Sequence, residues 1–427
     1  MNAKLFDFIK TSPTAYHAAK NAASTLGAAG AVRLYEKDAW TLESGKTYYV
    51  MRNSSSLISF KIPDGKASGF MIAAAHSDSP AFKLKDKAQY ADGNFVKLSN
   101  EVYGGMIYST WLDRPLSIAG RVVVKTERGV EERLVDFGAP VCIIPSVAIH
   151  MNRKANEGAM FNPAVDLVPL AGLDCGFSVK DEAAKLAGVE CDDVLSHDLF
   201  IYNPQDCKEF AGLITAPRLD DLECAFAALE AFALSSPDGA VPVCCLFDNE
   251  EVGSMTKQGA ASAFFSDVLE RIASALGMTD EELKRTLSSS LMLSCDNAHA
   301  LHPNHPEYAD KNNAVVMNGG VVIKYNASQR YTTDAVSSAL FKVMCEGAGV
   351  PTQSYANRSD IPGGSTLGAM SVMKVSINSA DIGLAQLAMH SSYETAGAKD
   401  LEYMVKALEK FFSSSVEQTG DGKYAVR

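Results

Sequence analysis

The chain has 427 residues, of which 47% are hydrophobic and 21% charged. These values are typical of globular proteins and exclude collagen-like, coiled-coil and wholly disordered classes, and the length predicts two folding units. The net charge of -12 and the lack of Lys/Arg runs argue against nucleic acid or an anionic membrane as the main partner.

The N-terminus and the cysteines indicate a soluble protein of the cytoplasm. The opening MNAKLFDFIK lacks the apolar segment of a signal peptide, and no run approaches about 18 uninterrupted apolar residues. The nine cysteines are scattered without a C-x-x-C pair. This pattern favours a reducing compartment over a disulfide or thiolate–zinc framework.

Apolar runs alternate with helical patterns along most of the chain. Ser12-Pro13-Thr14 begins a predicted helix over 15–28. Runs without polar alternation, as in strands buried on both faces, occupy 69–76, 241–247, 291–295 and 372–377. Helices are predicted between them, in 219–234 and 267–277. This order predicts an α/β sheet flanked by helices, with ligands beyond the carboxyl ends of its strands.

The stretch from about residue 87 to about residue 204 has a different pattern. Short β-like pieces with glycine turns occupy 121–126, 132–138 and 141–150. We therefore predict that residues 89–204 form a mainly β domain, which is inserted into a catalytic domain made of residues 1–88 and 205–427.

Several of the predicted strands end at metal-ligand side chains. His76 ends the first apolar run, and the H-x-D spacing allows Asp78 to orient its imidazole. Glu250 and Glu251 follow the second run, where adjacent carboxylates raise each other's pKa unless a cation is present. Taken singly, an H-x-D pair is more often structural, and an acidic cluster is as often a solvated turn.

Further ligand types follow the later strands. Asp296 ends the run at 291–295, and His390 follows the run at 372–377. Asp220 stands at a helix start, where an acidic residue is more often a simple helix-terminal charge. Two histidines and several carboxylates at one sheet edge are the ingredients of a mixed N/O site for zinc.

Six blocks in this order and spacing resemble the aspartyl aminopeptidase family of metallo-aminopeptidases: HSDSP, APRLDDL, DNEEVGS, SCDNAHALHPNH, IKYNASQRY and MHSSYE. The resemblance spans essentially the whole chain. It implies a zinc-peptidase sheet of the phosphorylase/hydrolase-like type, interrupted by a mainly β domain used in assembly. It also implies a peptide substrate with a free N-terminus.

The family pattern also implies a role for each ligand residue. Asp220 would bridge two zinc ions, which Mn²⁺ or Co²⁺ can replace. One metal would take His76 and Asp296, and the other Glu251 and His390. The resemblance further implies a cis peptide bond between Asp220 and Asp221.

Four more residues receive roles by the same resemblance. Glu250 would be the general base, and Asp78 the acid that orients a ligand. Lys324 would contact the substrate side chain, and His150 would reach a neighbouring subunit's active site within a dodecamer. His299, His302 and His305 allow either a third metal site or structural roles, and Pro303 and Pro306 favour the structural alternative.

The resemblance implies a preference for N-terminal Asp or Glu. A broader aminopeptidase acting on neutral residues such as Leu is the alternative, because the metal centre is indifferent to the substrate side chain. Amidohydrolases and deacylases share this type of metal set. A non-catalytic assembly protein with a structural metal is the alternative of another class. Glu250 argues against it, because a structural site has no use for a free carboxylate beside the metals.

Overall fold

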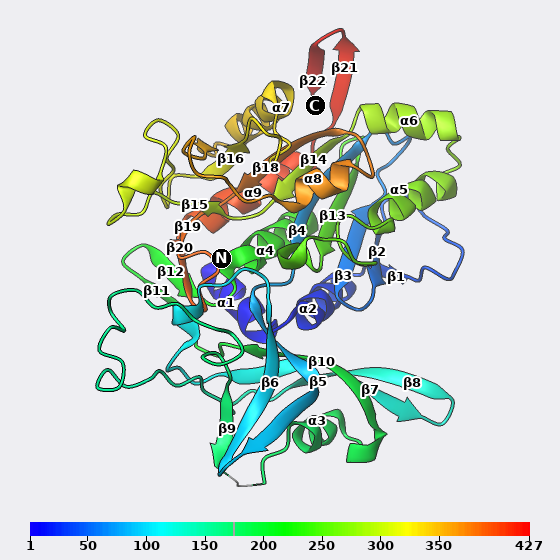
Figure 1. Cartoon of the computed structure of the whole chain (residues 1–427). Coiled ribbons are helices and arrows are strands. Elements are labelled where there is room, and N and C mark those ends of the chain that lie inside the picture. Colours follow the sequence, from blue (N-terminus) through cyan, green and yellow to red (C-terminus); the bar gives the residue numbers. More distant parts are fainter. Residues whose placement is uncertain (174–175) are drawn as a thin grey trace.

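A mixed nine-stranded sheet forms the centre of the larger part of the molecule in the computed structural model, which describes residues 1–173 and 176–427 (Figure 1). Its order is β1-β2-β3-β13-β4-β14-β18-β16-β17. The bounds are β1 Val32–Leu34, β2 Thr47–Arg52, β3 Ser56–Lys61, β13 Val241–Phe247, β4 Phe70–His76, β14 Leu291–Cys295, β18 Asn378–Gly383, β16 Val321–Tyr325 and β17 Thr352–Ala356.

The three central strands β13, β4 and β14 run parallel and are buried throughout. Successive side chains of a strand point to opposite faces, so a strand covered on both sides needs apolar residues at every position. In β4, Met71, Ala73 and Ala75 pack into one core, while Ile72 and Ala74 pack into the other. The strands predicted at 69–76, 241–247 and 291–295 are thereby confirmed.

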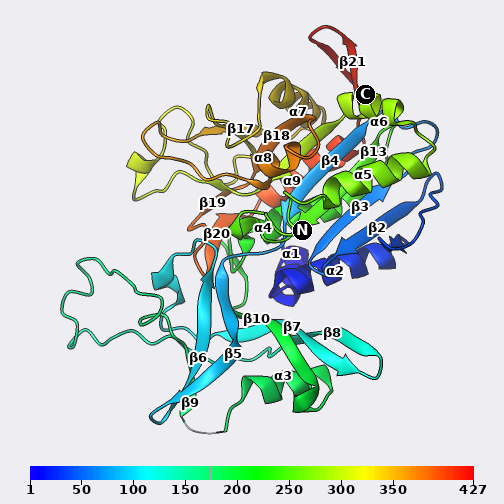
Figure 2. The same ribbon diagram turned by 45° about the vertical axis from the view of Figure 1, so that its right-hand side comes forward.

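Helices cover both faces of this sheet (Figures 1 and 2). The core on one face includes residues of α1, α2, α4, α7 and α9, and the core on the other includes residues of α5 and α8. The helix bounds are α1 Asn2–Thr11, α2 Ala15–Ala28, α4 Leu219–Leu234, α5 Phe264–Ala275, α6 Asp280–Ser288, α7 Ala335–Gly347, α8 Leu367–Val372 and α9 Asp400–Phe412. The α2 and α4 bounds match the predicted ranges.

The strand predicted at 372–377 is wrong. Helix α8 extends to Val372, and the strand of the sheet is β18, which begins at Asn378. This strand carries a fully buried Asp381, whose carboxylate accepts hydrogen bonds from Thr332 N and Oγ1 at 2.6 and 2.8 Å. Because tertiary hydrogen bonds satisfy this polar residue, an apolar pattern could not identify the strand.

A separate six-stranded sheet lies on one side of the larger part and has its own core (Figure 2). It is antiparallel, in the order β8-β7-β10-β5-β6-β9. Its elements are β5 Ala81–Asp92, β6 Phe95–Tyr103, β7 Ser117–Thr126, β8 Gly129–Asp136, β9 Leu170–Leu173 and β10 Val194–Tyr202, with helix α3 Val179–Ala187 packed against it.

The β-like piece predicted at 141–150 does not form a strand. It makes only isolated bridges, Leu116 with Cys142 and Ile143 with Leu170, within the part of the chain that the structure describes. Pro145 lacks the N–H that a strand ladder requires. From there to the start of β9 the chain is largely irregular and exposed.

A five-stranded sheet and a C-terminal hairpin complete the fold. The five strands are β11 Lys208–Phe210, β12 Leu213–Ala216, β20 Glu394–Gly397, β19 Ala385–Leu387 and β15 Ala298–His299, and the hairpin consists of β21 Val416–Gly420 and β22 Lys423–Val426. Among the described residues, no helix combines the length and the apolar character that crossing a membrane requires.

Candidate metal centre

The parallel strands of the nine-stranded sheet deliver most of the site. His76 is the last residue of β4, and Asp296 directly follows β14. Glu250 and Glu251 stand in a 3-10 turn, Glu250–Val252, which follows β13. Because the carboxyl ends of parallel strands meet at one edge, these four side chains converge although they are far apart in sequence.

Asp220 and His390 reach the same place from other elements. Asp220 lies in the first turn of α4 with φ -81° and ψ 109°, outside helical geometry, and its peptide bond to Asp221 is cis, as the resemblance implied. His390 lies in the turn between β19 and β20 of the five-stranded sheet, with φ 65°. It therefore does not follow a strand of the central sheet, contrary to the prediction.

The two carboxylate oxygens of Asp220 face different histidines. Oδ1 lies 3.4 Å from His76 Nε2, and Oδ2 lies 3.4 Å from His390 Nε2. The His76 side also includes Asp296, whose Oδ1 is 4.0 Å from Nε2. The His390 side includes Glu251, whose Oε1 is 3.4 Å from Nε2. Asp220 thus joins two three-residue groups, each able to hold a metal ion.

The three 3.4 Å spacings fit zinc, and the 4.0 Å spacing of Asp296 is longer. A tetrahedral zinc ion with bonds of about 2.0–2.1 Å holds its ligand atoms roughly 3.3–3.4 Å apart. Asp220 Oδ1 and Glu251 Oε1 are buried and have no hydrogen-bond partner among the described residues. Buried carboxylate oxygens without a donor are costly unless a cation is bound, so this donor set suits metal ions.

The charges of the group lead to the same conclusion. Burial raises the pKa of Glu251 well above its usual value, and the charge of Asp220 adds to this effect. Although burial lowers the pKa of His390, the hydrogen bond to Asp220 and the charge of Glu251 raise it to about 10. These directions reflect an excess of negative charge, which divalent cations would neutralise.

Glu250 lies beside these groups with a less constrained side chain. It forms a possible metal group with His76 and Glu251, yet no hydrogen bond holds its carboxylate within the described part of the chain. Burial raises the pKa of Glu250 to about 7, and the charges of Asp296 and Asp78 add to the rise. A carboxylate with a pKa near neutrality can take up and release a proton at physiological pH.

Asp78 connects the two sides of the site. Its backbone oxygen lies 3.0 Å from His76 Nδ1, and its Oδ1 lies 3.4 Å from the same nitrogen. Its carboxylate also accepts hydrogen bonds from the backbone N–H groups of Glu250 and Glu251, both at 3.1 Å. With Nδ1 occupied in this way, His76 Nε2 faces Asp220 and Asp296.

Of the two residues predicted to bind the substrate, Lys324 lies next to the site and His150 lies in an exposed segment. Lys324, in β16, is 2% exposed and lies next to the site, with Nζ 3.3 Å from Asp296 Oδ2 and 2.9 Å from Asn297 O. His150 is exposed in the irregular segment before β9 and belongs to none of the metal-binding groups found among the described residues. His302 and His305 likewise lie outside these groups.

Sequence reasoning missed several supporting residues. Glu394 accepts hydrogen bonds from the backbone N–H of Asp220 at 3.0 Å and of His390 at 2.7 Å. Asp221 Oδ2 accepts one from His76 N at 3.1 Å. Glu394 belongs to the MHSSYE block, so its closeness to His390 in the sequence could have indicated a role at the site. Tyr103, which donates to Asp78 Oδ2 at 2.7 Å, carried no such signal.

Comparisons with known proteins agree with this geometry. The family model described as Aminopeptidase I zinc metalloprotease (M18) matches residues 8–412. The chain belongs to the M18 family. A probable M18 family aminopeptidase 2 of Clostridium novyi is 42% identical over 424 residues, covering 96% of this chain and 98% of the relative. The predicted family is therefore confirmed, and the chain is an M18 zinc metallo-aminopeptidase, a hydrolase.

Solved structures of M18 proteins share the fold. A chain of the cryo-EM structure of the Ape4 and Nbr1 complex is 35% identical, with a TM-score of 0.93 and coverage of 96% of this chain and 85% of that one. The mApe1 dodecamer of S. cerevisiae is 29% identical, with a TM-score of 0.84 and coverage of 96% and 95%. The predicted fold class is confirmed by these neighbours.

Proposed function

We propose that this M18 enzyme holds two zinc ions per subunit and releases single residues, preferably Asp or Glu, from the free N-terminus of peptides. His76 and Asp296 would hold one ion, and Glu251 and His390 the other. Asp220 would bridge them, and Mn²⁺ or Co²⁺ are possible substitutes. The observation that carries this proposal is the position of the two Asp220 oxygens, each 3.4 Å from a different histidine.

The bound metals would supply Lewis acidity, a water of lowered pKa and an anchor for the α-amine of the substrate. The residues of the chain manage the proton and the geometry. Glu250 would accept a proton from the attacking water and deliver it to the leaving amine, because its carboxylate lies beside the proposed ligands without being needed as one. Asp78 keeps His76 and the backbone of Glu250 and Glu251 in position.

The proposed acidic preference depends on Lys324. The centre is rich in carboxylates, so an acidic substrate side chain needs a positive partner to offset their repulsion. Among the described residues, Lys324 is the only lysine or arginine that forms an ion pair with a proposed metal ligand, Asp296. The charge of Asp296 raises the pKa of Lys324 although burial lowers it, so the ammonium group stays charged at neutral pH.

One assay series tests the proposal. Purified protein is compared on aspartyl, glutamyl and leucyl dipeptides, as prepared, after chelator treatment, and after adding back zinc, manganese or cobalt. We expect two zinc ions per subunit by elemental analysis, loss of activity with chelator, and faster cleavage of the acidic substrates. One tightly bound zinc per subunit would contradict the dinuclear site, and equal rates on all substrates would contradict the preference.

We also propose that the subunits form a dodecamer in which His150 acts at a neighbouring active site. The irregular segment around His150 exposes large apolar side chains, with Met151 83%, Met160 98% and Val165 70% exposed. Exposed apolar residues grouped in this way are typical of subunit contacts, and the S. cerevisiae mApe1 relative is a dodecamer.

Subunit mixing tests the role of His150. The His150→Ala and Glu250→Gln variants are unfolded together, refolded as mixtures and compared with each variant refolded alone. A mixed assembly can contain sites with an intact Glu250 and a neighbour's intact His150, so we expect activity above that of either variant. Activity of the mixture no higher than the average of the two variants, or full activity of a monomer, would refute the shared site.

The proposed location is the cytoplasm. The eight cysteines in the described residues are free thiols, and six of them lie in the cores of the nine-stranded and six-stranded parts, where burial raises the pKa of the thiol. A protein with many buried thiols and no disulfide among its described residues suits a reducing compartment. Cell fractionation tests this location directly.

A further inference from the structure

A short segment that leaves the six-stranded sheet passes directly beside the candidate metal centre. This segment, Tyr103–Thr110, follows β6 and ends in the 3-10 turn Tyr108–Trp111. It contacts both sides of the site. Tyr103 approaches Asp78, and the backbone around Gly105 approaches His390.

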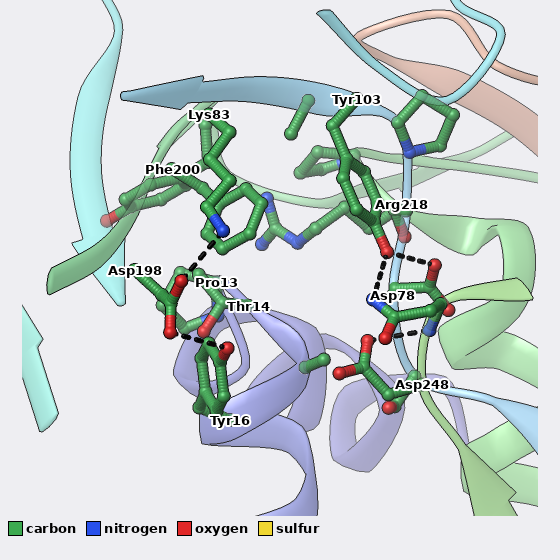
Figure 3. Close-up of a pocket in the computed structure, with 18 of the residues that line it drawn as sticks. Pro13, Thr14, Tyr16, Asp78, Lys83, Tyr103, Asp198, Phe200, Arg218 and Asp248 are labelled. Carbon is green, nitrogen blue, oxygen red and sulfur yellow. Dashed lines mark hydrogen bonds and ion pairs between the residues drawn. The ribbon is translucent and has the colours of Figure 1, made fainter. Parts of the chain in front are cut away.

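Tyr103 holds the Asp78 carboxylate. Its hydroxyl donates to Asp78 Oδ2 at 2.7 Å and accepts from Asn249 Nδ2 at 2.8 Å (Figure 3). Since the amide of Asn249 can only donate through this nitrogen, the single hydroxyl proton is directed to Asp78. The same carboxylate accepts the backbone N–H of Glu250 and Glu251, so its orientation affects the proposed base and one proposed ligand.

The backbone of the segment holds His390. Gly105 O accepts a hydrogen bond from His390 Nδ1, and Ile107 N donates to His390 O at 3.0 Å. A proton on Nδ1 leaves Nε2 with its lone pair, and Nε2 is the nitrogen that faces Asp220 and Glu251. A backbone carbonyl in this position fixes the ring orientation and tautomer of a metal-binding histidine.

Gly104 allows the close approach of the segment. Its φ is +76°, and a Cβ atom at this position would lie 3.1 Å from Glu251 Cβ. Both the positive φ and the limited space favour glycine. The segment therefore packs against a third residue of the candidate site.

We infer that Tyr103–Thr110 is a positioning element, by which the six-stranded sheet sets the geometry of the metal centre within the same subunit. Tyr103 is its main positioning residue and acts through Asp78. The inference rests on the proposed metal ligands. It gives the six-stranded sheet a role in metal binding in addition to any role in assembly.

The test compares Tyr103→Phe with Tyr202→Phe. Tyr202, in β10 of the same sheet, also donates a hydrogen bond from its hydroxyl to a carboxylate, that of Asp136, at 2.7 Å. Asp136 is not one of the proposed metal ligands, so this hydrogen bond serves as the control. Zinc affinity is measured by competition with a chromogenic chelator. The visible spectrum of the cobalt-substituted protein and kcat and KM for one dipeptide are recorded alongside.

We expect Tyr103→Phe to weaken zinc binding by about 10- to 100-fold, the range typical of residues that orient metal ligands. Its cobalt spectrum should change and kcat should fall more than KM rises, while Tyr202→Phe should match the wild type in all three measurements. Wild-type affinity and spectrum in Tyr103→Phe would overturn the inference, as would equal losses in both variants.

Gly104→Ala provides a second measurement. The added methyl group displaces Glu251 or the segment, so we expect weaker zinc binding than in Gly129→Ala, a positive-φ glycine of the same sheet with nothing near its Cβ position. Equal affinities in the two glycine variants would count against the inference. If the wild type binds no zinc, the proposed function fails; if it binds zinc and Tyr103→Phe binds equally well, only the inference fails.

Discussion

The two large sheets neutralise their acidic side chains by different means. On the six-stranded sheet, Asp198 pairs with Lys83 at 2.7 Å and with Arg121 at 2.9 Å. At the edge of the nine-stranded sheet, Asp220 and Glu251 are buried and contact histidines, and no lysine or arginine among the described residues pairs with either. The first region contains its own counter-ions, whereas the second requires them from outside.

This difference separates a charge-balanced cluster from a candidate metal centre. A carboxylate that pairs with both a lysine and an arginine, as Asp198 does, has its charge balanced within the protein. Buried carboxylates whose partners are histidines offer both the charge and, once the imidazoles are deprotonated, the lone pairs that zinc needs. The balance of acidic and basic side chains within a buried group is therefore more informative than the number of acids.

The largest expected effect is the loss of a ligand. We expect His390→Ala to lose metal from its side of the site and to lower activity to the level of the assay background, because Nε2 faces both Asp220 and Glu251. His197→Ala, on β10 of the six-stranded sheet, is the matched control and should retain both. Elemental analysis and a dipeptide assay measure the outcome, and full activity of His390→Ala would exclude it as a ligand.

The next effect separates the base from the ligands. Glu250→Gln should retain near wild-type metal content while turnover falls by about 10²- to 10⁴-fold, since a proton acceptor is removed and no ligand is. Glu132→Gln, which breaks the exposed ion pair with Arg121 on the other sheet, should leave turnover unchanged. Loss of a stoichiometric zinc from Glu250→Gln would make Glu250 a ligand instead.

A smaller effect on activity is expected from the loss of Lys324, which lies beside Asp296. Lys324→Ala should lower kcat/KM for aspartyl and glutamyl substrates by about 10- to 150-fold, the equivalent of one charge-assisted hydrogen bond. Leucyl substrates should change much less. Lys97→Ala, which breaks the pair with Asp92 at the far end of the six-stranded sheet, should affect neither class. If Lys324→Ala slows all substrates equally, the lysine acts by orienting Asp296 and not by binding the substrate.

The smallest effects are on stability, and they should have opposite signs in the two regions. Burial, with the charge of Asp400, raises the pKa of Glu223 to about 8. Its contribution to stability is therefore present below the usual pKa of 4.5 and is lost as the pH rises through about 8. Glu223→Gln mimics the neutral acid and should stabilise the protein by about 1–3 kcal/mol above that pH.

Asp198 should respond in the other direction. Although burial raises the pKa of Asp198, hydrogen bonds and charges from Lys83 and Arg121 hold it below its usual value. Its contribution is present above the usual pKa and is lost as the pH falls, so Asp198→Asn should destabilise by about 1 kcal/mol at neutral pH and by less in acid. Unfolding by urea across the pH range measures both variants, and equal signs above about pH 8 would refute the comparison.

Residues at strand ends could be predicted because the same local pattern determines both the strand and its end. A strand buried on both faces must be apolar at every position, and the polar residue that ends it stands where the sheet presents ligands. His76, Glu250, Glu251 and Asp296 were found in this way. The strands that precede these residues, β4, β13 and β14, also have the predicted bounds to within one residue.

The pattern failed where long-range contacts replaced apolar character. β18 contains a buried Asp381, which Thr332 satisfies from another part of the chain. The apolar run at 372–377 instead follows the end of α8. Hydrogen bonds between residues far apart in sequence cannot be read from local composition.

The sequence by itself indicated the family through the resemblance of six blocks, and that resemblance implied the ligand set. It also indicated the α/β class and several ligand types at strand ends, because apolar periodicity is a local property. Only the tertiary structure determined that the two oxygens of Asp220 face different histidines. It also revealed that Tyr103, 25 positions from Asp78, reaches the centre from another sheet. Such contacts depend on the docking of one sheet against another, and that docking is decided by the packing of the whole chain.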